Sequence, residues 1–151
     1  MQKTIISDTS CLILLYNIGE LNLLQKLFGK VLITTVIAKE FGSTLPSWIE
    51  IADPVNKDYE LILQEKLDEG EASAIALAVE QKDCLLILDD QKARKLVSDL
   101  GIHFTGTLGV LVDAKLQGHL SSIRDVLQKI KQTNFRISPD LEKIILFRCE
   151  E

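Results

Sequence analysis

Residues 84–90, Cys84-Leu85-Leu86-Ile87-Leu88-Asp89-Asp90, form a continuous apolar run that stops at two carboxylates. A short run of this kind, without alternation, is typical of a strand covered on both faces, as in a parallel sheet. The segment Thr4-Ile5-Ile6-Ser7 is similar, because it is short, rich in β-branched residues and followed at once by Asp8. Both segments therefore predict buried strands that end at acidic residues.

Strand-like and helix-like segments alternate along the rest of the chain, and glycines follow several of the helix-like ones. This alternation predicts a parallel sheet with helices on both faces. The predicted strands are Thr4–Ser7, Val31–Thr35, Cys84–Leu88 and Ile102–Thr105, with a short one at Trp48–Ala52. The predicted helices are Leu12–Ile18, Glu20–Phe28, Val36–Phe41, Lys57–Leu67, Glu69–Gln81, Gln91–Leu100, Thr107–Gln117, Ser121–Gln132 and Pro139–Arg148.

The composition suits one domain over residues 1–151 with an aliphatic core, because 46% of the residues are hydrophobic and only 5% aromatic. No apolar run approaches the roughly 18 residues that cross a bilayer. The start, Met1-Gln2-Lys3, leads directly into a strand and lacks the order of a signal peptide. We therefore expect a cytoplasmic protein without a membrane span.

The net charge of −5 argues against a protein that grips nucleic acid through a broad basic face. It is compatible with a nucleic-acid enzyme whose acids hold divalent cations, because bound ions reverse the local charge. The three cysteines, Cys11, Cys84 and Cys149, are far apart, and with two histidines and no C-x-x-C pair they do not indicate a zinc site. We expect Cys11 and Cys84 to be buried as small hydrophobes.

Acidic residues cluster at one predicted edge of the sheet. Asp8 follows the first strand, and Asp89 and Asp90 follow the strand at 84–88. Glu71 lies in the first turn of the helix before that strand, and Glu40 lies about one and a half helical turns beyond the second strand. Ligands of parallel sheets bind beyond the carboxyl ends of the strands, where strand order reverses. We therefore expect these acids to converge.

Such a group of acids suits phosphodiester hydrolysis, which needs an activated water and a way to absorb charge on the phosphate. Two divalent metal ions about 3.5–4 Å apart can supply both. Mg²⁺ and Mn²⁺ prefer carboxylate oxygens, so a ligand set without His or Cys is the expected one.

Each acid also has a purely structural interpretation. Asp68 and Glu71 have the spacing of a capping box at the start of a helix. Asp89 or Asp90 can cap the helix that follows them, and Asp8 can cap the first helix. The common placement at one sheet edge is stronger support for a metal site than any single residue.

Four segments, taken in order, resemble PIN-domain nucleases, and the last three are similar to an uncharacterised prokaryotic PIN-like subgroup. They are Asp8-Thr9-Ser10, Leu67–Ala78, Leu86–Arg94 and Thr105–Leu111, and the resemblance extends over about three quarters of the chain, from Ile5 to Gly118. It implies a three-layer α/β/α sandwich with a central parallel sheet, and Mg²⁺- or Mn²⁺-dependent ribonuclease activity.

The resemblance also implies roles for individual acids, as catalytic residues and metal ligands. Asp8 is the central ligand, Glu40 the second acid, Glu71 the third and Asp90 the fourth. Without the resemblance, Glu40 would be interpreted as a solvated helix residue. Asp89 is a departure, because a non-acidic residue often precedes the last Asp, so the choice between Asp89 and Asp90 as ligand stays open. Glu71 is a second departure, because many PIN enzymes have Asp there.

Many proteins that the chain resembles are VapC-type toxins, which pair with a small antitoxin protein and form homodimers. The resemblance thus implies an RNA substrate, a small antitoxin partner and a homodimer. The alternative is a PIN-fold module that binds RNA or a protein without cleaving, which the Glu at position 71 and the acidic net charge keep open.

Other residues have two interpretations each. Thr9 and Ser10 can hydrogen-bond a ligating carboxylate or a phosphate, or they can cap the first helix. Trp48 can stack on a base or pack in the core. Three basic residues after the Asp pair can meet the RNA backbone or form a solvated helix face: Lys92, Arg94 and Lys95.

Two other classes with acidic sites fit less well. A receiver-like signalling domain would need its Asp pair on the first strand and a Lys after a last strand. A von Willebrand-type D-x-S-x-S metal motif is incomplete, because Leu12 occupies its final position.

Overall fold

The computed structural model describes residues 3–151, and its centre is a sheet of five parallel strands in the order β3-β2-β1-β4-β5. The strands are β1 (Thr4–Ser7), β2 (Val31–Ile33), β3 (Ile49–Ile51), β4 (Cys84–Ile87) and β5 (His103–Thr105). The chain moves outward from β1 to β3 in one direction and then from β4 to β5 in the other. Strand order therefore reverses between β1 and β4, which places the topological switch point at their carboxyl ends.

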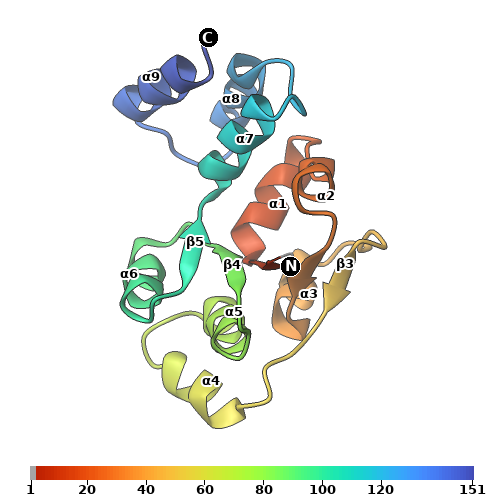
Figure 1. Cartoon of the computed structure of the whole chain (residues 1–151), viewed down its shortest axis with the longest axis vertical. Helices are drawn as coiled ribbons and strands as arrows, with labels where there is room; N and C mark the ends of the chain where they lie inside the picture. The colour runs from red at the N-terminus through yellow and green to blue at the C-terminus, as the bar shows by residue number, and fades with distance from the viewer. Residues whose placement is uncertain (1–2) are drawn as a thin grey trace.

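Helices cover both faces of this sheet, as the alternating pattern predicts. Helices α1, α2 and α7 lie on one side of the sheet in Figure 1 and α4 and α5 on the other, while α8 and α9 stack beyond α7. The helices among the described residues are α1 (Thr9–Asn17), α2 (Asn22–Phe28), α3 (Thr35–Phe41), α4 (Lys57–Leu63), α5 (Glu69–Val79), α6 (Gln91–Asp99), α7 (Thr107–Leu116), α8 (Ile123–Lys131) and α9 (Pro139–Arg148). The predicted α/β architecture with a central parallel sheet is confirmed.

The core is aliphatic and centres on the two middle strands. Ile6 of β1 is in register with Leu86 of β4, and both side chains are fully buried. Ile75 of α5 and Leu15 of α1 are also fully buried. Burial of the middle strands on both faces explains why their sequences are continuous apolar runs.

A predicted strand and a predicted helix both end earlier in the structure than the sequence pattern indicates. The second strand ends at Ile33 and not at residue 35, because the Thr34 hydroxyl accepts a hydrogen bond from the Ile37 N–H and begins α3. Helix α4 ends at Leu63 and not at residue 67, which leaves a short turn before Asp68 caps α5. Capping side chains compete with strand and helix continuation in this way at many element ends.

The predicted burial of Cys11 and Cys84 is confirmed, and Cys149 is buried as well. Trp48 is half-buried and packs against the core, as its packing interpretation predicts. Across residues 3–151, no helix has both the length and the apolar character that a membrane span requires.

We predict that Leu86→Ala lowers the free energy of unfolding by about 2–5 kcal/mol, because it leaves a cavity in a fully buried site. Urea unfolding followed by circular dichroism measures the change. The matched control is Leu61→Ala on α4, where the leucine is 61% exposed and a change within about 0.5 kcal/mol is expected. Equal losses for the two variants would contradict the assignment of β4 to the centre of the core.

Candidate metal-binding active site

Asp8 lies at the carboxyl end of β1 and is only 3% exposed. Its Oδ1 accepts a hydrogen bond from the Cys11 N–H at 3.0 Å, which makes Asp8 the N-cap of α1. Its Oδ2 accepts from the Ser10 hydroxyl at 3.0 Å and from the Asp89 N–H at 3.3 Å. One carboxylate thus connects the ends of β1 and β4 with the start of α1.

The pKa of Asp8 is raised from 3.8 to about 6, and burial of the carboxyl group is the main cause. The negative charge of Asp89 raises this pKa further, whereas the hydrogen bonds from Cys11, Ser10 and the Asp89 backbone lower it. The hydrogen bonds only partly offset the loss of solvation, so the charged form of Asp8 is costly without a cation.

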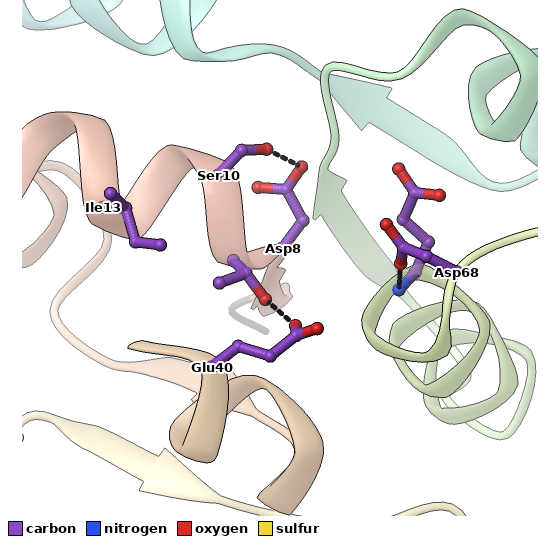
Figure 2. A pocket seen from close by; sticks show the side chains of 7 residues that line it. Asp8, Ser10, Ile13, Glu40 and Asp68 are labelled. Carbon is purple, nitrogen blue, oxygen red and sulfur yellow. Dashed lines mark hydrogen bonds between the residues drawn. The ribbon is translucent and has the colours of Figure 1, made fainter. Parts of the chain in front are cut away.

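Glu40 extends from α3 toward the start of α1, where the Thr9 hydroxyl donates a hydrogen bond to its Oε1 (Figure 2). Gly70, the second residue of α5, lies against the same carboxylate, since a Cβ added at Gly70 would collide with Glu40 Oε1. Glu40 is therefore held between α1 and α5. The predicted hydrogen bonds of Thr9 and Ser10 to carboxylates are present, because Ser10 donates to Asp8 in the same way. The role of these carboxylates as metal ligands stays a prediction.

Glu71 lies in the first turn of α5, and the pKa of its carboxyl group is raised from 4.5 to about 7. Desolvation is the largest cause, followed by the negative charges of Asp68 and Asp90, and Asp8 adds to them. The Asp68 carboxylate caps α5 by accepting from the Glu71 N–H at 2.8 Å. The capping and site interpretations of Glu71 are thus compatible: its backbone takes part in the cap while its side chain lines the pocket.

These side chains surround one hollow of about 310 Å³, which we call the carboxylate pocket (Figure 2). Asp8 and Ser10 at the start of α1 face Asp68 across it. Its lining residues are Asp8, Thr9, Ser10, Ile13, Glu40, Asp68 and Glu71. Four of them are carboxylates and none is Lys, Arg or His, so the pocket concentrates negative charge.

Asp89 and Asp90 follow β4 but do not line the carboxylate pocket. Asp90 caps α6 by accepting from the Ala93 N–H at 2.9 Å, although its charge still reaches Glu71. The Asp89 carboxylate points instead toward α7, where it accepts from the N–H of Thr107 at 2.9 Å and from the Thr107 hydroxyl. The predicted cluster is therefore divided, with Asp8, Glu40 and Glu71 in the pocket, Asp90 near it and Asp89 turned away.

Asp68 is the pocket carboxylate that sequence reasoning missed as a site residue, because its spacing from Glu71 indicated only a helix cap. Ile13, which closes one wall, was missed as well. Its position one helical turn beyond Thr9 and Ser10 could have indicated a residue on the same face of α1.

A family model described as PIN domain matches residues 4–151. The chain belongs to the PIN-domain family. A search of curated proteins gave no match. Membership shows that the fold is of the nuclease type, and it agrees with the resemblance seen in the sequence motifs.

The donor chemistry of this PIN domain suits a hard divalent cation, because Asp8, Glu40 and Glu71 offer carboxylate oxygens and the pocket has no positive lining group. Within residues 3–151, no three His, Cys, Asp or Glu side chains are spaced to ligate one ion directly. Mg²⁺ commonly keeps several waters and takes only one or two protein carboxylates. The residues therefore fit a hydrated ion rather than a closed cage.

We predict that the metal-free PIN domain loses stability as pH rises from about 4 to 7. Between pH 3.8 and about 6 the unfolded chain has released the Asp8 proton while the folded state retains it, so the free energy of unfolding falls with pH. At about 1.36 kcal/mol per pKa unit, the folded state loses about 3 kcal/mol through Asp8. Glu71 adds a smaller loss, because its side chain is only half-buried and solvent screens its charge.

Urea unfolding with EDTA, repeated across this pH range, measures the change, and Asp8→Asn is the reference. Asn is also a good N-cap, and its side-chain oxygen can still accept from the Cys11 N–H. Its amide nitrogen cannot accept from the Asp89 N–H, but this loss does not depend on pH and leaves the comparison valid. We expect the stability of the wild type relative to this variant to fall by about 2 kcal/mol between pH 4 and pH 7, because part of the total loss occurs below pH 4. A pH-independent difference would contradict a raised pKa at Asp8.

Proposed function

We propose that this PIN domain is a Mg²⁺- or Mn²⁺-dependent endoribonuclease that hydrolyses phosphodiester bonds in RNA. The observation that supports the proposal is the carboxylate pocket itself, in which Asp8, Glu40 and Glu71 come together at the switch point of a nuclease-type fold. Their negative charges face one another without a basic residue in the lining, and a divalent cation would relieve this repulsion.

In this proposal, Asp8 and one of the two glutamates, Glu40 or Glu71, would ligate the ion directly, the other would contact it through a retained water, and Asp90 would contribute from the edge of the pocket. When bound, the ion supplies an activated water and stabilises charge that develops on the phosphate. Asp8 and Glu71 have raised pKa values and must release protons to bind it. Thr9 orients Glu40 by its hydrogen bond.

The second candidate function is an RNA- or protein-binding PIN module that does not cleave. Two observations favour it: no three acids within residues 3–151 are spaced to ligate one ion directly, and the third acid is Glu71 instead of Asp. In this case the acids would serve mainly as helix caps, as Asp8, Asp68 and Asp90 do.

For the biological setting we propose the toxin of a toxin-antitoxin pair, acting as a homodimer and silenced by a small antitoxin protein. Support comes only from the resemblance of the motifs to VapC-type proteins. Induced expression of the chain, alone and with the product of a short neighbouring reading frame, tests the setting. Growth arrest that the second product relieves is expected, and unimpaired growth contradicts the toxin role.

We predict that the wild type cleaves a mixed pool of single-stranded RNA in the presence of Mn²⁺, and that Asp8→Asn lowers the rate by at least about 100-fold while circular dichroism stays unchanged. The matched control is Asp99→Asn, which removes an exposed carboxylate at the end of α6 and should leave the rate unchanged. Equal activity in Asp8→Asn would indicate a contaminating nuclease. Lack of cleavage together with retained RNA binding would favour the second candidate.

We predict that Gly70→Ala weakens Mn²⁺ binding and cleavage by about tenfold without destabilising the fold, because the new Cβ displaces the Glu40 carboxylate. Alanine favours the helix more than glycine does, so α5 should remain intact. The control is a double-mutant cycle in which Gly70→Ala is added to Glu40→Ala. No further loss is expected there, and a full tenfold loss would show that Gly70 does not act through Glu40.

A further inference from the structure

A second and larger hollow, which we call the arginine groove, lies on the other side of Asp89. Its volume is about 560 Å³, and it is bounded by residues of α6, β5, the start of α7 and α9. The Asp89 carboxylate lines this groove, while its backbone N–H donates to Asp8 in the carboxylate pocket. Asp89 therefore lies between the two hollows.

The groove is positively charged, although the chain as a whole has a net charge of −5. Three arginines line it, Arg94, Arg136 and Arg148, against the single carboxylate of Asp89. Arg94 is fixed in place, since its Nε donates to the Leu88 carbonyl at 2.7 Å and its Nη2 lies 3.8 Å from Asp89 Oδ1. Arg136 and Arg148 are exposed and form no ion pair within residues 3–151.

Apolar and aromatic side chains form the rest of the lining. The Arg94 guanidinium lies over the Phe104 ring, 5.4 Å from the ring centroid. Phe135, which directly precedes Arg136, lines the same groove. Ile144 on α9 lines the groove and is 58% exposed, so it offers apolar surface to a bound molecule. Aromatic rings and arginine planes beside cationic groups form a platform on which unpaired bases stack.

We infer that the arginine groove binds a single-stranded segment of the RNA whose scissile phosphate enters the carboxylate pocket. Arg136 and Arg148 contact phosphates, and Phe135 and the apolar wall contact bases. The inference rests on the proposed function for its substrate class. A single strand fits better than a duplex, because the bases of a duplex are paired and its surface offers mainly phosphate and sugar.

Binding is tested apart from cleavage, with EDTA present and fluorescence anisotropy of a labelled, mixed-sequence 12-nucleotide RNA as the readout. The test variant is Arg136→Gln/Arg148→Gln. The matched control is Lys26→Gln/Lys82→Gln, which removes the same charge from exposed positions outside the groove. Circular dichroism confirms that both variants fold.

We expect the test variant to bind the RNA at least about tenfold more weakly than the wild type. The plot of log binding constant against log salt concentration should become less steep by about 1.4, the value for two lost phosphate contacts on a single strand. The control variant should keep most of the affinity, and a duplex of the same sequence should bind more weakly than the single strand. Equal losses in the two variants, or equal binding of duplex and single strand, would overturn the inference.

Two further outcomes separate this inference from the proposed function. Arginine-dependent RNA binding without Mn²⁺-dependent cleavage would refute the nuclease and leave the groove as an RNA site. Cleavage with an unchanged KM in the test variant would overturn the assignment of the groove as the RNA site, while the proposed nuclease activity would stand. Binding of a labelled oligoglutamate but not of RNA would also overturn the inference, because it would indicate an acidic protein partner.

Discussion

The carboxylate of Asp8 joins three parts of the chain at the point where the sheet reverses its strand order. It caps α1 through the Cys11 N–H and accepts from Ser10 and from the backbone of Asp89 beyond β4. These bonds satisfy its oxygens but do not offset burial, so its pKa stays raised to about 6. Asp8 thus links the elements at the switch point, although burial disfavours its ionised form there.

The charges around Asp8 extend this imbalance across the carboxylate pocket. Glu71 has its pKa raised to about 7, partly by Asp68 and Asp90, and Glu40 approaches from α3. The four carboxylates share one hollow, and two of them, Asp8 and Asp68, also cap helices there. On the other side of Asp89 the local charge is positive, because arginines line the arginine groove. Under the proposed function, a cation held in the carboxylate pocket beside this positive groove would suit the cleavage of a polyanion.

The sequence predicted the sheet and the position of Asp8 well, because both depend on local patterns: a buried run that stops at an acid marks the end of a strand. It did not predict that Asp89 turns toward Thr107, since that choice depends on where β4 and α7 meet in space. The contact of Gly70 with Glu40 also joins distant segments and has no local signal. Metal binding by these acids stays a prediction. It depends on the distances between side chains from separate elements, which a sequence pattern does not specify.

The occupancy of the carboxylate pocket by a divalent cation can be measured most directly by anomalous diffraction from crystals soaked in Mn²⁺ at neutral pH. We predict one strong peak in the pocket, within ligand distance of Asp8 and of either Glu40 or Glu71, and none in Asp8→Asn crystals. Retained waters should complete the coordination of the ion. The absence of a peak at saturating Mn²⁺, or a peak only outside the pocket, would contradict the central claim that these acids form a metal site.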